Sequence, residues 1–460
     1  MGISVKKYDF DMIAIGGGVA GIAAAEAAAK AGAKVAIVEK GKIGGAAVNT
    51  RDIPYAAGLN FSHLYAEAIY GSRFGLSSDR LRFNYPTVSH WRERVVAREA
   101  AELKKELEDL KIECFRGRAH FVGPHEVAVG KEGRLTARKF LIATGVEQKD
   151  SGIIGLENVP YLTPDDALKV ERPPKTVMIV GGGASGVEIA QYYAELGSKV
   201  AIAEIAERLL PKEDEEVGQV LEQYFTKRFD IKILASTRVI AVERDAISPK
   251  VIFLRNGQEK MVRVETIVVA AGTKPATDIG LENAGMRFSK NGSFKVDQML
   301  QTPLKHIYAA GDVLQGDSST EKAVYEAGIA VKNMFGRSKH YVNYSGFIRV
   351  TNTNPQIAVV GMTEDDLNKR ARKYNSVVIP LSEVMASKTQ DFRMGFIKMI
   401  AAKDGKILGA TVMAPNATEV IQEIAVMIRH SFSVTQLAST PHVAMSWSDL
   451  VRIAAKELAK

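Results

Sequence analysis

The sequence predicts an α/β protein in which one structural unit occurs twice and is followed by a region of a different pattern. Residues 11–39 combine a short apolar run, a glycine-rich turn, an alanine-rich stretch and a second apolar run, and residues 176–204 repeat this order without a gap. This order predicts strand, tight turn, helix and strand. From Tyr344 on, apparent strands alternate with helices and the unit does not recur, which is typical of a separate α+β domain.

The first unit has the residue spacing that a bound dinucleotide requires. Gly16, Gly18 and Gly21 follow the first apolar run as G-x-G-x-x-G. The first glycine permits a sharp turn, the second lets a pyrophosphate approach the backbone, and the third lets the helix pack closely on the strand. Glu39 ends the second run about 20 residues later, where a carboxylate can accept hydrogen bonds from a ribose 2′-OH. We therefore predict a Rossmann-like dinucleotide-binding domain.

The second unit predicts another Rossmann-like domain. Gly181, Gly183 and Gly186 repeat the three glycines, and Glu204 repeats the acid at the end of the second strand. Two chance glycine turns would not reproduce that acid. The charge of Glu204 would repel a 2′-phosphate, so it favours NADH over NADPH, although Arg208 lies nearby in the sequence.

Composition bounds the class of protein. The chain has 460 residues, 46% hydrophobic and 25% charged, which suffices for two to four domains with substantial cores. The formal net charge is +8, but the cations are interspersed with acids, so we expect no nucleic-acid partner. Glu26 and the glycine turn interrupt the apolar run at 12–29, so we expect neither a signal peptide nor a transmembrane segment.

Cysteine usage is minimal. Cys114 is the only cysteine, which excludes an intrachain disulfide and a cysteine metal cluster and fits a cytoplasmic protein. Its apolar neighbourhood predicts a buried structural thiol without a redox role. We expect no metal site.

The remaining pattern predicts the order of elements along the chain. A charged helix, short hairpins and two strands that close the nucleotide folds are expected at 87–112, 121–137, 140–145 and 267–272. Residues 156–174 contain several prolines and suit a crossover between domains. Later strands are expected at 307–313, 396–401 and 409–414, and later helices at 321–335, 417–430 and 446–458.

Further motifs accompany the two glycine turns and their acids. They are Gly44-Gly45 with Asn49 and Ile53-Pro54, Ala143-Thr144-Gly145, Ala271-Gly272 before Lys274-Pro275, Ala310-Gly311-Asp312, and the stretches 360–364 and 408–410. Along the whole chain these motifs resemble the flavoprotein disulfide reductases (class I pyridine nucleotide-disulfide oxidoreductases), with dihydrolipoamide dehydrogenase and mercuric reductase as the nearest relatives.

The resemblance implies cofactors, domains and an oligomeric state. FAD would sit on the first unit and NAD(H) on the second, and the C-terminal domain would form a homodimer. The implied domains are an FAD-binding domain at 1–150, an NAD-binding domain at 151–272, a central part at 273–343 that completes the FAD domain, and a dimerisation domain at 344–460. Asp312 would bind the flavin ribityl chain. The other implied cofactor-binding residues are Lys40, Gly45, Ala119, Thr144, Gly145, Gly272 and Gly311.

The chain departs from the family at the residues that carry the thiol chemistry. The family has two cysteines with four residues between them, which form a disulfide beside the flavin and pass electrons by thiol exchange. Ala47 and Asp52 stand at those positions. The family lysine is matched by Ala56, so Glu188 keeps the place of a glutamate near flavin N5 without that partner. The dithiol half-reaction is therefore not expected.

The acid–base histidine of the family is also missing. At the family's spacing, Ala444 stands in place of the base and Asp449 in place of the acid that holds it. His442 lies two residues earlier and matches a non-catalytic histidine. We expect it to pack at the dimer seam rather than to act as the base.

These departures favour an FAD-dependent NADH oxidoreductase in which electrons leave the flavin directly. The acceptor would be a quinone, a metal ion, oxygen or a redox protein. Glu188, Arg51, Asp52 and Tyr55 are the candidate catalytic residues, and the last three either line an acceptor pocket or simply fill the vacated space. Two alternatives stay open: pyridine nucleotide transhydrogenation, which Glu204 disfavours, and a non-catalytic flavoprotein subunit of a larger assembly.

Overall fold

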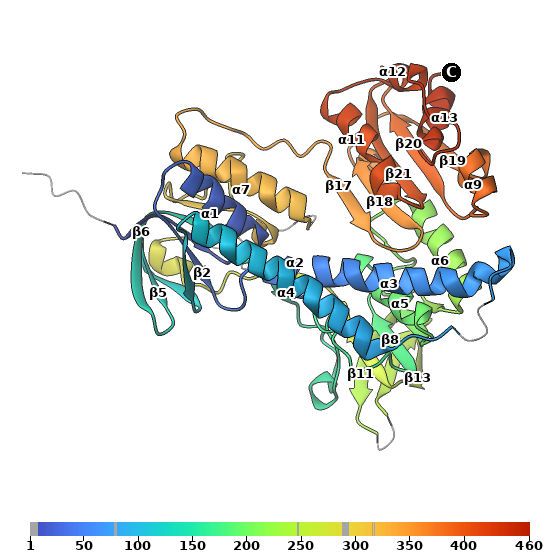
Figure 1. Ribbon diagram of the computed structural model, residues 1–460, viewed down its shortest axis with the longest axis horizontal. Helices are drawn as coiled ribbons and strands as arrows, with labels where there is room; N and C mark the ends of the chain where they lie inside the picture. The colour runs from blue at the N-terminus through green and yellow to red at the C-terminus, as the bar shows by residue number, and fades with distance from the viewer. Residues whose placement is uncertain (1–7, 78–80, 246–247, 288–293, 315, 317) are drawn as a thin grey trace, which may run out of the picture. The chain divides into compact units, whose positions relative to one another are not determined.

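The chain forms two compact units, each assembled from three stretches (Figure 1). A computed structural model describes residues 8–77, 81–245, 248–287, 294–314, 316 and 318–460. The first unit comprises Met1–Tyr55, His90–Asp150 and Gly272–Asn343, and the second comprises Ala56–Ser89, Ser151–Ala271 and Tyr344–Lys460. Both units are therefore discontinuous in the sequence.

The first unit is built on a seven-stranded sheet in the order β3-β2-β1-β6-β5-β4, with β16 also paired to β6. The strands β3, β2, β1, β16 and the second half of β6 run parallel, whereas β4, β5 and the first half of β6 form antiparallel hairpins. The bounds are β1 (Phe10–Ile15), β2 (Val35–Glu39), β3 (Glu113–Arg116), β4 (Ala119–Gly123), β5 (Glu126–Val129), β6 (Gly133–Ile142) and β16 (Ile307–Ala309).

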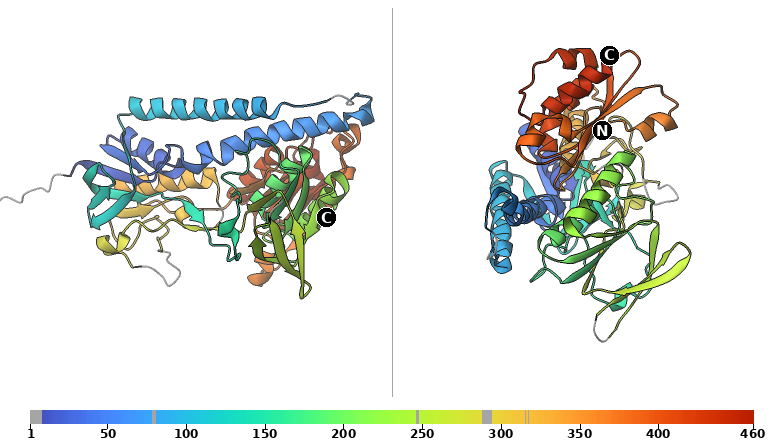
Figure 2. Two further views of the ribbon diagram at one scale, coloured as in Figure 1. Left: turned by 90° about the horizontal axis from the view of Figure 1, so that it is seen from below. Right: turned by 90° about the vertical axis from the view of Figure 1, so that its right-hand side faces the viewer.

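Two helices cover one face of this sheet. The helices α1 (Val19–Lys30) and α7 (Thr320–Phe335) lie side by side in Figures 1 and 2, and both contribute alanines to one buried cluster. Alanine lets the helices approach each other and the strands closely. Three short helices and a two-stranded ladder also belong to this unit: α2 (Gly45–Asn49), η3 (Leu281–Ala284), η4 (Asp312–Leu314), and β7 (Val146–Gln148) paired with β15 (Thr273–Pro275). The chain divides between the units within the helices α3 (Asp52–Tyr70) and α4 (Tyr85–Asp109).

The second unit contains the second nucleotide fold. Its parallel sheet has the order β10-β9-β8-β14, and a three-stranded antiparallel sheet, β11-β12-β13, belongs to the same unit. The bounds are β8 (Thr176–Val180), α5 (Ala184–Glu195), β9 (Lys199–Ala203), α6 (Glu215–Phe229), β10 (Lys232–Leu234), β11 (Thr237–Glu243), β12 (Lys250–Arg255), β13 (Gln258–Arg263) and β14 (Thr266–Val269).

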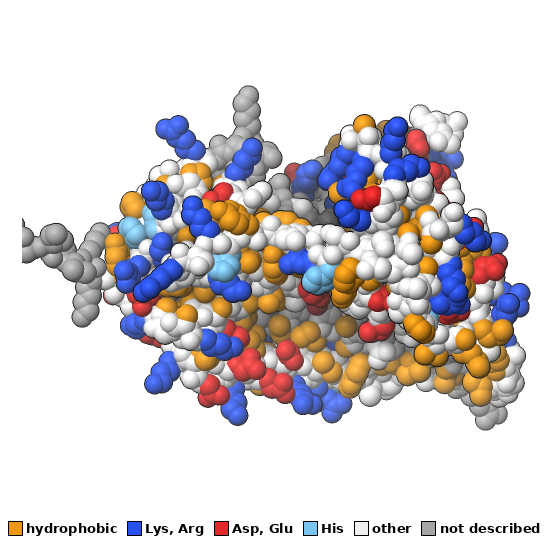
Figure 3. Space-filling model, turned by 90° about the horizontal axis from the view of Figure 1, so that it is seen from above, with side chains coloured by type: hydrophobic (Ala, Val, Ile, Leu, Met, Phe, Trp, Pro, Cys, Tyr) orange, Lys and Arg blue, Asp and Glu red, His pale blue; other side chains and the backbone are white. Residues whose placement is uncertain are grey.

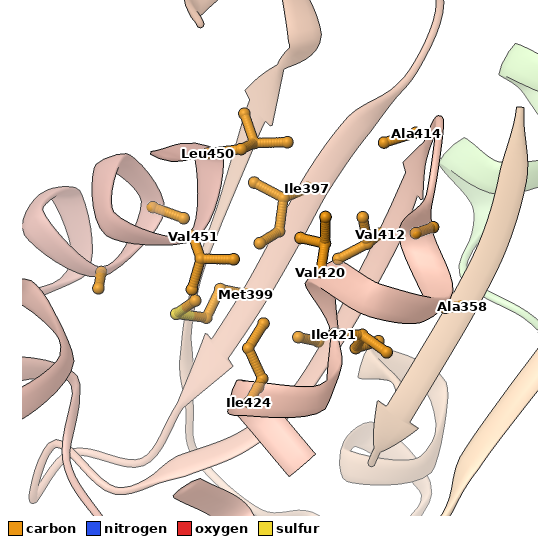
Figure 4. Close-up of a cluster of buried hydrophobic side chains, with 14 of the residues drawn as sticks. Ala358, Ile397, Met399, Val412, Ala414, Val420, Ile421, Ile424, Leu450 and Val451 are labelled. Carbon is orange, nitrogen blue, oxygen red and sulfur yellow. The ribbon is translucent and has the colours of Figure 1, made fainter. Parts of the chain in front are cut away.

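The same unit includes a C-terminal antiparallel sheet in the order β17-β18-β21-β20-β19. Its inner face carries apolar side chains that meet those of the covering helices (Figure 4). The strands are β17 (Ile348–Thr351), β18 (Gln356–Gly361), β19 (Asn375–Pro380), β20 (Phe396–Ala401) and β21 (Ile407–Ala414). The helices are α8 (Glu364–Lys369), α9 (Met385–Thr389), α10 (Ala417–Val420), α11 (Gln422–Arg429), α12 (Val434–Ser439) and α13 (Asp449–Leu458).

A buried lysine joins the nucleotide fold of this unit to the C-terminal sheet. Lys398 on β20 has a side chain that is only 2% exposed. Its Nζ lies 2.9 Å from Glu216 in the first turn of α6 and 2.5 Å from Glu364 in the first turn of α8. Asp214, the N-cap residue of α6, lies 3.7 Å from the same nitrogen and accepts a hydrogen bond from Thr411. One cation thus lies within 4 Å of three carboxylates and partly offsets their charge.

Most predicted elements are confirmed. The predicted helices at 87–112 and 321–335 are α4 and α7, whereas the one predicted at 417–430 is divided into α10 and α11. Among the described helices, none is long and apolar enough to cross a bilayer. On the face shown in Figure 3, basic and acidic side chains are interspersed.

Two features of the fold differ from the sequence-based expectation. The sequence pattern does not predict helix α3, because Pro54 and Gly58 interrupt it; Pro54 is tolerated because it lies in the first turn. The expectation that Cys114 is buried is wrong: the residue is exposed. It lies on β3, an edge strand of the sheet, where apolar sequence neighbours do not guarantee burial. Partial burial of the thiol still raises its pKa, with Glu108 adding to the effect.

Candidate functional site

The glycine turn of the first unit stands at the carboxyl end of β1. Gly16 has φ +110°, and a Cβ on it would lie 2.2 Å from the carbonyl oxygen of Ala143. A Cβ on Gly21 would lie 1.9 Å from the oxygen of Gly16, so neither position can hold another residue without displacing backbone. Gly18 caps α1 without a side chain, which leaves the first-turn N–H groups facing outward for an anion.

A short helix holds Gly45 against this turn. A Cβ on Gly45 would lie 2.7 Å from the Cα of Gly18, and the N–H of Gly44 donates a hydrogen bond to the carbonyl of Gly17 at 2.8 Å. Asn49, the last residue of α2, donates from its side-chain amide to the carbonyl of Gly45 at 2.9 Å. The Gly44-Gly45 motif with Asn49 is therefore a local unit that closes on the glycine turn.

Glu39 closes the same turn from the end of β2. Its carboxylate accepts hydrogen bonds from the N–H groups of Gly17 and Gly41, each at 2.6 Å. Each carboxylate oxygen can accept more than one hydrogen bond, so capacity remains for a ribose hydroxyl. The N–H of Gly117 donates to the Glu39 carbonyl at 2.9 Å, which brings the segment leading to Ala119 alongside this strand end. Lys40 is exposed next to it.

Polar groups continue along the same sheet edge beyond β6. The hydroxyl of Thr144, which follows β6, is buried and has no hydrogen-bond partner among the described residues. A buried unpaired hydroxyl is costly, and a polar ligand group at this edge would satisfy it. Gly145 and Gly311 both adopt positive φ here, and Asp312 directly follows Gly311.

The strand order indicates which way a dinucleotide would lie along this edge of the sheet. Glu39 ends β2, the glycine turn follows β1, and Asp312 follows β16 on the opposite side of β1. A dinucleotide centred on the turn would therefore place its adenosine over β2 and its other half toward β16. The residues fit FAD: Glu39 would hold the adenosine ribose, the turn the pyrophosphate, and Asp312 the ribityl chain.

Charged groups surround Asp312. Its pKa is raised, chiefly by burial and further by the nearby charge of Asp52, while a hydrogen bond from Ser318 and the charges of Lys322 and Arg51 counteract the rise. Glu326, whose side chain is 1% exposed, accepts a hydrogen bond from the N–H of Gly311 at 2.7 Å and lies 3.8 Å from Lys322 Nζ. Burial is thus the dominant influence on the Asp312 carboxyl.

Three predicted residues cluster in the first unit next to Asp312. Asp52 is the first residue of α3 and accepts a short hydrogen bond from the hydroxyl of Thr320, the first residue of α7. Arg51 precedes it, and its carbonyl accepts a hydrogen bond from the N–H of Tyr55 at 2.7 Å. Tyr55 is only 7% exposed. Asp52, which the sequence resemblance places at the second family cysteine, thus presents a carboxylate bonded to the start of a second helix.

The second glycine turn reproduces the first. Gly181 has φ +110°, and a Cβ on Gly186 would lie 1.9 Å from the Gly181 oxygen. Glu204 is 7% exposed and accepts hydrogen bonds from Gly182 N–H at 2.5 Å and Ala206 N–H at 2.7 Å. A Cβ on Gly183 would meet no atom within 4 Å among the described residues, so open space lies in front of this backbone. This is the space that a pyrophosphate would need.

Glu188 has a partner that the sequence does not reveal. The residue lies on α5, is 8% exposed, and accepts hydrogen bonds from the backbone N–H of Asn352 at 2.6 Å and from its side-chain amide at 3.2 Å. Asn352 directly follows β17. These two donors stabilise the carboxylate of Glu188. The pairing could not be anticipated, because the two residues are 164 positions apart.

The C-terminal residues that the resemblance places at the family's acid and base positions make contacts within the chain. Asp449 is bonded to Arg452 at 2.6 Å, and Ala444 carries no ionisable group. His442 lies 3.0 Å from Glu423 through Nε2 and 2.9 Å from the Thr440 carbonyl through Nδ1. Both ring nitrogens of His442 are therefore engaged within the chain.

Comparison with known proteins agrees with this geometry. Residues 10–327 match the family model "Pyridine nucleotide-disulphide oxidoreductase", and residues 348–455 match the dimerisation domain of the same family. The chain belongs to this family. It is accordingly an oxidoreductase of the flavoprotein type with two dinucleotide-binding folds and a dimerisation domain.

Individual relatives are similar over nearly the whole chain. A mercuric reductase of Bacillus cereus is 31% identical over 445 residues, covering 96% of this chain and 70% of the relative. A dihydrolipoyl dehydrogenase of Bacillus subtilis (strain 168) is 28% identical over 455 residues, covering 97% and 96%. The crystal structure of LpdA from Mycobacterium tuberculosis superposes with a TM-score of 0.85 at 25% identity, covering 97% of this chain and 99% of that one.

Proposed function

We propose that the protein is an FAD-dependent NADH oxidoreductase that delivers electrons from the flavin to an acceptor without a cysteine relay. One observation carries the proposal. In both glycine turns the glycines keep their close backbone contacts, and Glu39 and Glu204 accept hydrogen bonds from the turns, whereas Asp52 is expected where the family has its second cysteine and is bonded to Thr320. Bound FAD would supply the hydride chemistry, and the protein would bind and orient the two cofactors.

The residues of the second unit would select and hold the coenzyme. Gly183 leaves space for the pyrophosphate, and the first turn of α5 would face it. Glu204 would accept hydrogen bonds from the adenosine ribose and disfavour a 2′-phosphate. Glu188, held by Asn352, is proposed to border the nicotinamide end of the reaction.

The acceptor is proposed to be a small molecule or a redox protein. A quinone, a metal ion and oxygen are the small acceptors that need no thiol. Arg51, Asp52 and Tyr55 are proposed as the residues nearest to it, and a cytoplasmic homodimer as the working form. Transhydrogenation is less favoured, because it requires NADPH to be used appreciably against the charge of Glu204.

The test is anaerobic stopped-flow mixing of the FAD-loaded protein with NADH and, separately, with NADPH, following the oxidised flavin absorbance. Fast bleaching by NADH and slow bleaching by NADPH is expected. Equal bleaching by both would move transhydrogenation to first place, and no bleaching with FAD bound would indicate a non-catalytic flavoprotein. Steady NADH-dependent reduction of lipoamide would refute the absence of dithiol chemistry.

Removing the only thiol should leave flavin reduction unchanged. Cys114 lies on the edge strand β3, and its raised pKa keeps it a thiol rather than a reactive thiolate near neutral pH. Cys114→Ser is expected to be reduced by NADH within about twofold of the wild-type rate. The measurement is the stopped-flow rate with and without prior alkylation of the wild type. A large loss of the flavin-reduction rate in both the Cys114→Ser variant and the alkylated wild type would mean that electrons pass through this sulfur.

Shortening Glu204 should change coenzyme preference. Glu204→Ala removes the acceptor for the ribose and the repulsion of a 2′-phosphate, so NADH should bind about tenfold more weakly and the preference over NADPH should narrow. Glu207→Ala, an exposed acid on the same loop, is the matched control. The measurement is the apparent Kd for NADH and for NADPH, obtained from the amplitudes of flavin reduction. An unchanged preference for NADH over NADPH would contradict the assignment of Glu204 to the ribose site.

A further inference from the structure

The residue in place of the second cysteine lies at the flavin half of the FAD site. The sheet edge places the adenosine over β2 and the other half of a dinucleotide toward Asp312. Asp52 acts electrostatically on Asp312 and is bonded to Thr320, eight residues further along the chain than Asp312. All three residues belong to the first unit, so their proximity does not depend on any contact with the second.

Two helix starts and a hydroxyl donor meet at Asp52, while the carboxyl of Asp312 lies nearby. It is the first residue of α3, which has 19 residues, and its carboxylate accepts a hydrogen bond at the first residue of α7, which has 16. The N-terminal ends of helices carry partial positive charge, which attracts a carboxylate. The hydroxyl of Thr320 directs its proton at the carboxylate, which further suits an anion.

We propose that Asp52 is a fixed negative charge that lowers the midpoint potential of the bound flavin. The inference rests on the FAD site of the proposed function. Reduction by two electrons and one proton adds a negative charge to the flavin, and a neighbouring carboxylate opposes it. The lower potential weakens the drive from NADH to the flavin and strengthens the drive from the flavin to the acceptor. Asp52 would thus act on the electronics of the cofactor where the family cysteine acts as a relay.

A purely structural role predicts a different outcome. The contact between Asp52 and Thr320 also joins the starts of two helices, and a side chain that only filled space would do the same. Asp52→Asn keeps an oxygen that can accept the hydrogen bond but removes the charge. Thr320→Val keeps the charge but removes the donor. The two variants therefore separate the charge from the contact.

The experiment measures the midpoint potential of the FAD-loaded full chain at pH 7 by equilibration with reference dyes. Asp52→Asn is expected to shift it positively by about 30 mV, which is a tenfold change in the reduction equilibrium for a two-electron couple. Thr320→Val is expected to leave it unchanged or shift it negatively. Glu321→Gln, an exposed acid in the first turn of α7, is the control and should cause no shift.

Two results would overturn the proposal. One is an Asp52→Asn potential equal to that of the wild type, and the other is an equally positive shift in Thr320→Val. The dye equilibration uses neither NADH nor an acceptor, so a protein that NADH fails to reduce would still report whether Asp52 sets the potential. Failure of the proposed function and failure of this inference are therefore distinguishable.

Discussion

Gly186→Ala should abolish flavin reduction by NADH while FAD remains bound. The added Cβ would lie 1.9 Å from the carbonyl oxygen of Gly181 and 3.0 Å from its carbonyl carbon, and both atoms belong to rigid backbone. The start of α5 must then move away from the turn, which removes the N–H groups that would face the pyrophosphate. We expect the NADH-dependent rate at fixed coenzyme concentration to fall by at least about 100-fold, equivalent to about 2.7 kcal/mol.

A neighbouring glycine provides the matched control. A Cβ on Gly183 meets no described atom within 4 Å, and its φ of −74° suits any residue. Gly183→Ala should therefore preserve thermal stability and weaken only coenzyme binding, since the methyl group would occupy space needed by the ligand. Flavin content from absorbance and reduction rates from stopped flow give the two readouts. A Gly186→Ala variant reduced at the wild-type rate would contradict the assignment of the second turn to NADH.

Lys398→Met should strongly destabilise the protein. Methionine roughly matches the length of the buried stem but leaves Asp214, Glu216 and Glu364 without their common cation. Breaking a fully buried ion pair by removing one partner costs about 3–5 kcal/mol, and the partial exposure of Glu216 and Glu364 places the expected cost at the low end of this range. We expect the unfolding temperature at pH 7.5 to fall by about 10 °C, measured by differential scanning fluorimetry. Lys403→Met, at an exposed position in the loop after β20, is the control and should change it little.

The destabilisation should shrink as the pH falls. Burial alone would raise the pKa of Glu364, but hydrogen bonds from Lys398 and Ser376 outweigh it and lower the pKa. Because this pKa lies below the ordinary value of a glutamate, the wild type keeps this stabilisation at pH 5 and loses it only at lower pH. In the variant, protonation already relieves the repulsion among the uncompensated carboxylates as the pH falls towards 5. The difference in unfolding temperature should be smaller at pH 5 than at pH 7.5. A constant difference would mean that lost packing, rather than uncompensated charge, causes the effect.

Local features of the sites could be predicted from the sequence. The roles of Gly16 and Gly181 in the turns, and of Glu39 and Glu204 at the strand ends, follow from spacing within about 30 residues. The structure gives both pairs the same geometry, down to an acid that accepts hydrogen bonds from its own glycine turn. Such features depend on short segments whose backbone conformation is set by the segment itself.

Contacts between distant segments could not be predicted. Asp52 and Thr320 are 268 positions apart, and Glu188 and Asn352 are 164 apart. The expected burial of Cys114 is wrong for a related reason, because the place of β3 at the sheet edge depends on pairing far from the local sequence. A single sequence can predict which residues of a family mechanism are replaced, but the contacts of the residues that are present appear only in the fold.

The link made by Lys398 has a consequence for ligand-dependent stability. The turn that would bind the coenzyme and the strand β20 belong to the same compact unit, and the ionic cluster connects β20 to the start of α6 in the nucleotide fold. A ligand that binds only the folded state stabilises it by about 2.7 kcal/mol at a concentration about 100 times its Kd. Amide hydrogens of β20 and β21, which lie outside the nucleotide fold, should then exchange more slowly with solvent when the coenzyme is bound. Binding of the coenzyme to the nucleotide fold would thus be detectable as slower hydrogen exchange in the C-terminal sheet.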